Sequence, residues 1–291
     1  MAAICLRELS KDVDPAWAAF LKPVLTSLVF LPVVLVLAKR KANVWPSKST
    51  FAKLIVAGVI VQIAGHLLYQ WSLGEIGIAL VVPLTIGSMV FFSAVGGSLF
   101  LKERISWPLA LSLLLLVVSV FVLSSGGKQA AEMVATAASN QHSWLWAGIA
   151  AATAGLSFSV LGIAIRDALS TGLSIATPIL VTALCGVVIL GVASFGRLGW
   201  QVALETTPYQ WMLMVGAAVC NTLAFLALSI SLKKLALVYA HAINLSQVAM
   251  AAIVGLTLFS EPLSPWLGLG LILMVIGFGG MTQAARKKLD R

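Results

Sequence analysis

The sequence is poor in charged residues. Asp, Glu, Lys and Arg make up only 10% of its 291 residues, whereas a soluble globular domain has about 25%. Hydrophobic residues make up 60% of the chain, and the mean hydropathy is +1.03. Lipid is the solvent that tolerates so much apolar surface. The composition therefore excludes an ordinary soluble domain and predicts a protein embedded in a membrane.

Cysteine is scarce as well. Cys5, Cys185 and Cys220 form no CxxC pair, and the last two lie in apolar runs, where cysteine behaves as a small hydrophobic residue. We therefore expect no metal site and no cofactor.

Motifs of enzymes and of nucleic-acid-binding proteins are also missing. The chain has no HExxH, no GxSxG, no paired aspartates in an apolar run and no Cys/His cluster. The net charge of +9 comes from basic residues spread over short loops rather than gathered on one face. We therefore expect no catalytic residue, no enzyme activity and no nucleic-acid partner.

Long apolar runs dominate the rest of the sequence. A bilayer core of about 30 Å is crossed by about 20 helical residues, and continuous rather than alternating runs indicate helices. The expected helices cover residues 16–38, 52–72, 77–101, 107–125, 144–165, 174–196, 209–232, 236–259 and 265–285. The sequence thus predicts an all-α polytopic membrane protein, a bundle of about nine transmembrane helices whose partner is the lipid bilayer.

Basic residues collect in every second loop. These loops and the C-terminal tail hold 14 of the 19 Lys and Arg residues, counted from Lys39 to Arg291 along the printed sequence. Because basic loops stay on the cytoplasmic side, we expect a cytoplasmic C-terminus and an external N-terminus. The expected location is the plasma membrane, which in a bacterium is the inner membrane.

The chain contains a weak internal repeat at an offset of 158 residues. Residues 79–107 align with 237–265, so that Glu103 meets Glu261. The basic loops place these two glutamates on opposite sides of the membrane, so the copies are expected to run in opposite directions. Secondary transporters use this plan, with the substrate site near the midplane. We expect a first repeat at 1–125, an extracytoplasmic linker at 126–143 and a second repeat at 144–291.

Three segments resemble a known family. They are DPAWAAFLKPVLTSLVFLPVVLVLAKRK, LLYQWSLGEIGIALVVPLTIGSMVFFSAVGGSLFLKERIS and ALVYAHAINLSQVAMAAIVGLTLFSEPLSPWLGLGLILMVIGF. Together they make nearly the whole chain similar to the EamA-like family of the drug/metabolite transporter superfamily. The resemblance implies two repeats of five helices, a central cavity and alternating access, with amino acids, other metabolites or drugs as substrates. The first helix of the family pattern is not found here, because ICLRELSKDVDP resembles its end and the following turn. We therefore expect four helices in the first repeat and five in the second.

Polar side chains inside the apolar runs indicate a cavity or contacts between helices. In the second expected helix Gln62, His66, Tyr69 and Gln70 fall within about 100° on a helical wheel. This stripe predicts a cavity wall, and a hydrogen-bonded seam between helices is the alternative.

A similar stripe lies in the eighth expected helix. His241, Asn244 and Gln247 recur every three residues, and Tyr239 lies nearby. We predict that these residues line the same cavity, with structural polar packing as the alternative.

Four further residues are candidates for the cavity wall. Thr85, Ser88 and Asn221, which is followed by Thr222, are weaker ones, because the hydroxyl groups of Thr and Ser in helices also bond the carbonyls of their own helix. Lys22 either extends to the lipid headgroups or faces the cavity as a cation that attracts anionic groups. The small residues Ala151, Gly155 and Ser159, in contrast, are expected to allow close packing of helices.

These patterns predict a secondary transporter for a small polar metabolite, amino acid or drug. All ten acidic residues fall in loops or at helix ends, so coupling through a buried carboxylate is not expected. We expect facilitated transport or exchange, with proton coupling through His66 or His241 as a second option. A non-transporting membrane subunit or a channel is the alternative function. The partner is a small-molecule substrate, and the oligomeric state is left open between monomer and homodimer.

Overall fold

The computed structural model describes residues 2–102, 106–125, 143–242, 244, 246–259 and 265–289. These ranges are mostly helical, and no residue in them lies in a β-strand. The fold is that of an all-α polytopic membrane protein, as the composition predicts. Glu103, Glu261 and residues 126–142 of the expected linker lie outside the described residues.

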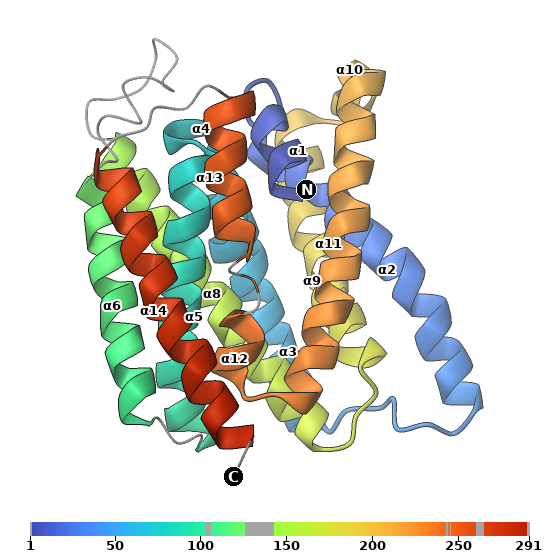
Figure 1. Ribbon diagram of the computed structural model, residues 1–291. Helices are drawn as coiled ribbons and strands as arrows, with labels where there is room; N and C mark the ends of the chain where they lie inside the picture. The colour runs from blue at the N-terminus through green and yellow to red at the C-terminus, as the bar shows by residue number, and fades with distance from the viewer. Residues whose placement is uncertain are drawn as a thin grey trace.

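The helices run up and down through one bundle (Figure 1). In chain order they are α1 (Ala2–Leu9), α2 (Pro15–Lys39), α3 (Lys48–Ile60), the π-helical segment η1 (Val61–Leu67), α4 (Leu68–Ile76), α5 (Ile78–Leu101), α6 (Trp107–Ser125), α8 (Ser143–Ser170), α9 (Ala176–Leu198), α10 (Gln201–Glu205), α11 (Pro208–Lys234), α12 (Leu237–Ala242), α13 (Ser246–Leu258) and α14 (Pro265–Leu289). Because α3, η1 and α4 follow one another without a gap, they form one membrane-length helix.

Local sequence signals fix where some helices begin. The Asp14 carboxylate accepts hydrogen bonds from the backbone N–H groups of Ala16 (2.9 Å) and Trp17 (3.4 Å). Pro15 takes the first helical position, so α2 begins there. Gly77 joins α4 to α5 with a φ of 76°. Glycine adopts this backbone without strain, which allows the chain to turn back sharply between the two helices.

Six described helices are long and apolar enough to cross a membrane, namely α2, the α3–η1–α4 helix, α5, α8, α9 and α11. Helices α6 and α14 contain shorter apolar runs, Ala110–Leu123 and Pro265–Gly277. The total of nine crossings stays a prediction.

The structure corrects one expected helix. Residues 236–259 were expected to form a single α-helix, but they contain two α-helices, α12 and α13, and Asn244 between them has 3₁₀-helical geometry, with residues 243 and 245 outside the described residues. The polar stripe of the eighth expected helix, which includes His241, Asn244 and Gln247, falls at this junction. A change of helix is tolerated at membrane depth where it lines a cavity instead of facing lipid. A smaller difference is α10, which lies in a segment expected to be a loop.

Three of the four helix pairs that the 158-residue offset relates lie side by side; in the fourth, the α3–η1–α4 helix (48–76) and α11 (208–234) do not pack along each other. Shifting α2 (15–39) by 158 gives 173–197, close to α9 at 176–198, and these two helices pack along each other. In the same way α6 packs against α14, and α5 packs against α12 and α13. Each contact joins one helix from each half of the chain, so the two halves are interleaved in one bundle.

Helices α5 and α8 pack closely against each other. A Cβ at Gly155 would collide with the backbone carbonyl of Thr85. The Thr85 hydroxyl donates to the Ala151 carbonyl (3.1 Å), and the Ser93 hydroxyl donates to Ser159 Oγ (3.2 Å). The small residues of α8 therefore form a packing surface, as the sequence predicts.

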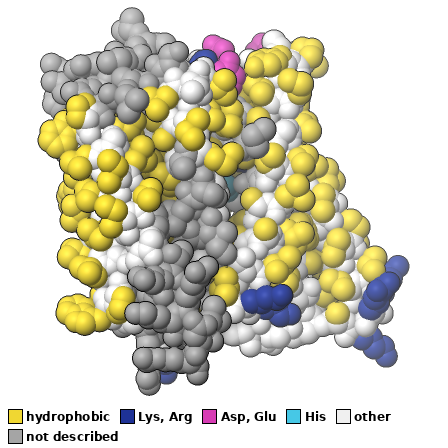
Figure 2. All heavy atoms as spheres, in the orientation of Figure 1, with side chains coloured by type: hydrophobic (Ala, Val, Ile, Leu, Met, Phe, Trp, Pro, Cys, Tyr) yellow, Lys and Arg dark blue, Asp and Glu magenta, His cyan; other side chains and the backbone are white. Residues whose placement is uncertain are grey.

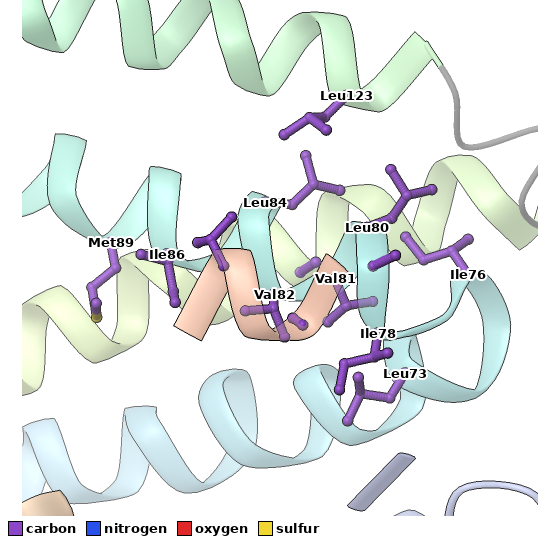
Figure 3. Packing of buried hydrophobic residues seen from close by; sticks show 14 of the residues in the cluster. Leu73, Ile76, Ile78, Leu80, Val81, Val82, Leu84, Ile86, Met89 and Leu123 are labelled. Atoms are coloured by element: carbon purple, nitrogen blue, oxygen red, sulfur yellow. The ribbon is translucent and has the colours of Figure 1, made fainter. Parts of the chain in front are cut away.

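Apolar side chains fill both sides of α5 (Figure 3). Leu80 and Leu84 face Leu123 of α6, and all three are buried in the largest hydrophobic cluster. Val82 and Met89 belong to the same cluster but also line the cavity described below. Helix α5 thus separates the packed core from the cavity.

The outside of the bundle is apolar along its sides (Figure 2). Large side chains such as Leu99, Phe121 and Val192 are each at least 70% exposed. Lys and Arg side chains gather at the lower end in this view, and Asp and Glu side chains are visible at the upper end. This distribution suits a surface that faces lipid in the middle and water at both ends.

Candidate functional site

A cavity of about 200 Å³ lies among α1, α2, η1, α4, α5, α8, α11 and the α12–α13 junction. Its polar lining residues are Lys22, His66, Tyr69, Thr85, Asn221, His241, Asn244 and Gln247. Its apolar lining residues are Ala2, Ala3, Leu6, Val82, Ile86, Met89, Phe158, Leu161, Gly162, Ile165, Ala224, Phe225 and Leu228. Eight of the residues that the sequence predicts for a cavity wall therefore lie around one space.

Lys22 is the only charged residue among those that line the cavity in the described part of the chain. It lies eight residues into α2 and is 2% exposed, so it does not extend to the headgroups. Its Nζ atom lies 3.2 Å from Nδ1 of His66. No described carboxylate lies within ion-pair distance of Lys22. The cavity wall thus contains a buried lysine amine whose described neighbour is a histidine instead of a carboxylate.

The π-helical segment η1 positions His66 and Gln62. Its wider turn occurs where η1 packs against α8, and the His66 ring meets Phe158 of α8 edge to face at 5.4 Å. Such π segments are frequent at functional sites. Gln62 donates to the Thr182 carbonyl (3.3 Å), and its side-chain oxygen has no partner among the described residues. Gln62 lines a side recess of about 30 Å³ together with Lys22, His66 and Asn221.

His241 is the most unusual polar residue of the cavity. It lies in α12, is fully buried, and neither ring nitrogen has a hydrogen-bond partner among the described residues. A Cβ at Gly162 of α8 would collide with Nε2 of His241, so glycine is needed for this approach. A buried polar group without a partner is costly. A ligand with hydrogen-bonding groups would offset this cost.

The α12–α13 junction adds two amide side chains. Asn244 lies between the helices, and its side-chain oxygen accepts a hydrogen bond from Gln247 (3.1 Å). Broken helices of this kind present polar groups to a substrate at membrane depth in secondary transporters.

Three residues predicted for the cavity lie elsewhere. Gln70 is fully buried and donates to the Leu6 carbonyl (2.8 Å), so it joins α4 to α1, as the alternative of a helix seam predicts. Ser88 faces α8, where its Cβ would lie 2.8 Å from a Cβ at Gly155. Tyr239 packs against the main hydrophobic cluster. Helical-wheel position alone does not separate these residues from the cavity wall.

The apolar half of the cavity was not predicted. Phe158, Phe225 and Met89 carry no sequence signal that distinguishes them from core residues, because all three lie in continuous apolar runs. The residues that α1 contributes to the cavity wall, Ala2, Ala3 and Leu6, were not predicted either. Only the packing of the helices shows which apolar residues meet the polar stripes.

The arrangement suits the binding of a small molecule. The described residues contain no group of three His, Cys, Asp or Glu side chains that could hold a metal ion. The cavity combines hydrogen-bonding side chains on α2, η1, α11, α12 and α13 with aromatic and aliphatic side chains. Such a mixture fixes the orientation of a small organic molecule.

Residues 1–125 match the model of the EamA-like transporter family. This match confirms, over the first 125 residues, the resemblance predicted from the sequence. The EamA-like region extends from α1 to α6 and includes Lys22, His66, Tyr69 and Thr85 of the cavity wall. The protein is thus an integral membrane protein with a region similar to a family of transporters.

Comparison with solved structures shows that the fold extends over the whole chain. A crystal structure of another protein, 15% identical in sequence, covers 98% of this chain and 96% of its own with a TM-score of 0.65. At this identity the likeness shows a shared fold only. No curated protein has a matching sequence.

Proposed function

We propose that the protein is a secondary transporter that moves a small polar metabolite, amino acid or drug by alternating access. The observation that supports this most directly is the cavity, which lies at a break between two helices and is lined by polar groups from several helices. A transporter needs a binding site at membrane depth that is rich in groups unsatisfied by the protein itself. The two ring nitrogens of His241 meet this description, and Lys22 bonds His66 but has no carboxylate beside it among the described residues.

The arrangement of helix pairs supports an inverted repeat as the basis of the movement. Of the four helix pairs related by the 158-residue offset, three pack against each other, namely α2 with α9, α5 with α12–α13, and α6 with α14. In this proposal residues 1–125 and 144–291 are the two repeats. Rocking of one repeat against the other would open the cavity to each side of the membrane in turn.

We place the C-terminus in the cytoplasm and the N-terminus outside, in the plasma membrane. The lower end in Figure 2, where Lys and Arg gather, is then cytoplasmic. Lys53 of α3 pairs with Asp167 of α8 at this end (2.7 Å), and Arg197 of α9 pairs with Asp14 at the other (3.3 Å).

We further propose facilitated transport or exchange rather than coupling to protons through a carboxylate. No described acidic residue lines the cavity. His66 and His241 are the alternative proton carriers. If transport in vesicles accelerates with an imposed pH gradient and this response is lost in His66→Gln or His241→Gln, the uncoupled mechanism is wrong.

A ligand screen followed by flux measurement tests the proposal. The purified protein is screened by thermal shift against amino acids, other metabolites and drugs, and each hit is measured for uptake into proteoliposomes. We expect saturable uptake that is accelerated by the same compound on the opposite side. Thermal stabilisation without flux would favour a non-transporting subunit, and a steady ion current would favour a channel.

A further inference from the structure

We infer that the substrate of this cavity is an organic anion, a carboxylate with a small apolar body, and that Lys22 binds its charged group. The inference rests on the proposed function only in taking the cavity as the substrate site. It adds the sign of the substrate's charge and names the residue that binds the charged group.

The first argument is the charge of the cavity. Lys22 is almost fully buried, and no described carboxylate pairs with it. A buried ammonium group is unfavourable unless an anion accompanies it. Among the described lining residues there is no acid that could serve this purpose, or that could bind an amine instead. An anion brought by the ligand would supply the missing counter-charge.

The second argument is the set of donors around Lys22. When protonated, Lys22 donates to Nδ1 of His66 (3.2 Å), which places the ring proton of a neutral His66 on Nε2. His66 and Asn221 line both the main cavity and the side recess with Lys22. An ammonium group, an imidazole N–H and a side-chain amide are suited to the two oxygens of a carboxylate.

The third argument is the shape and polarity of the remaining wall. Phe158, Leu161 and Phe225 line the cavity near Lys22 and His66, and Met89 lies on α5. Two of these, Leu161 and Phe225, also line the recess that contains Lys22. The volume of about 200 Å³ is below the range of about 300–1,000 Å³ for drug-sized ligands. The cavity therefore favours a small carboxylate with one apolar part.

Three probes of the same shape test the inference. They are 3-phenylpropionate, its neutral amide 3-phenylpropionamide, and the cationic 3-phenylpropylamine. Binding is measured by calorimetry on the full chain in nanodiscs of zwitterionic lipid, so that anionic headgroups do not compete. We expect the carboxylate to bind more tightly than the amide, and the amine to bind most weakly.

Lys22 variants then assign the preference. In Lys22→Gln we expect the carboxylate to lose at least about 30-fold in affinity, because one partner of a buried charge pair is removed, while the amide changes little. Lys22→Arg keeps the charge and should retain most of the preference. The control Lys234→Gln removes an exposed lysine at the end of α11 and should bind all three probes as the wild type does. Thermal unfolding confirms that each variant is folded.

The outcomes separate this inference from the proposed function. Equal binding of carboxylate and amide, or no carboxylate binding that depends on Lys22, contradicts the anion site. If vesicles nevertheless take up other compounds from the screen, transport stands without it. If the carboxylate binds through Lys22 and no compound crosses the membrane, the anion site stands and the transport proposal fails.

Discussion

Helix α5 and the α12–α13 pair occupy corresponding positions in the two halves of the chain, but their polar side chains differ in whether they bond a neighbouring helix. In α5 the hydroxyl groups of Thr85 and Ser93 bond to α8. In α12 both ring nitrogens of His241 lack a partner among the described residues. Helix α5 is continuous, whereas its counterpart is divided near Asn244.

This difference shows how one repeat unit can serve two purposes. A polar residue whose partner lies on a neighbouring helix holds the bundle together, and one without such a partner is available to a ligand. Small residues on α8 decide between the two. Gly155 brings α5 close enough for hydrogen bonds, while Gly162 allows His241 to reach the cavity wall.

The largest effect is expected from filling the contact between α5 and α8. In Gly155→Ala the new methyl group meets the Thr85 carbonyl, so the helices must separate. We expect a loss of about 1–3 kcal/mol in the free energy of unfolding. The matched control is Gly148→Ala in the same helix, where a Cβ would meet nothing within 4 Å. Denaturation in detergent that ranks the two variants equally would show that the contact is not tight.

The next effect separates cavity residues from helix-seam residues. His241→Leu removes unpartnered nitrogens, so we expect unchanged or slightly higher stability. Uptake by vesicles should fall on the order of tenfold, as expected when one ligand hydrogen bond of about 1.4 kcal/mol is lost.

Gln70→Leu is the matched comparison, because Gln70 is equally buried but bonds the Leu6 carbonyl. Here we expect a loss of stability of about 1 kcal/mol with little change in uptake. If instead Gln70→Leu abolished uptake and His241→Leu only lowered stability, Gln70 would belong to the binding site and His241 to the packing of the helices.

The smallest effect concerns a single hydroxyl group in α5. Ser93→Ala removes a hydroxyl that bonds the Met89 carbonyl of its own helix and Ser159 of α8, and hydrogen bonds between membrane helices contribute about 0.6 kcal/mol on average. Ser231→Ala, which removes a hydroxyl bonded to its own helix at Ala227, is the control. Thermal unfolding should separate them by a small but reproducible shift, and uptake should be unchanged in both. A loss of uptake in Ser93→Ala would contradict a purely structural role for this face of α5.

The sequence predicts the elements of this fold well because lipid imposes one simple rule on them. Apolar runs must be helical, and the limits expected for 107–125 coincide with those of α6. The change from α-helix to 3₁₀ geometry at Asn244 was not predicted, because no proline or glycine marks it. Its polar residues signal a cavity but not an interrupted helix.

The candidate site is predictable only in its polar half. A polar residue within an apolar run stands out, which is why Lys22 and His241 could be named from the sequence. Whether such a residue faces a cavity or a neighbouring helix depends on tertiary packing, as Gln70 shows. The aromatic wall depends on the same packing and has no signal of its own.

Alternating access of the cavity is tested most directly by cysteine labelling. In a background with Cys5, Cys185 and Cys220 replaced by serine, Asn221→Cys places a thiol on the cavity wall and Ala217→Cys places one in the buried core of the same helix. Each variant is treated with a membrane-impermeant maleimide in two preparations. In right-side-out vesicles the reagent reaches the external face of the protein, and in inverted vesicles it reaches the cytoplasmic face. We predict that Asn221→Cys reacts from both sides and Ala217→Cys from neither. Reaction of Asn221→Cys from one side only would contradict alternating access.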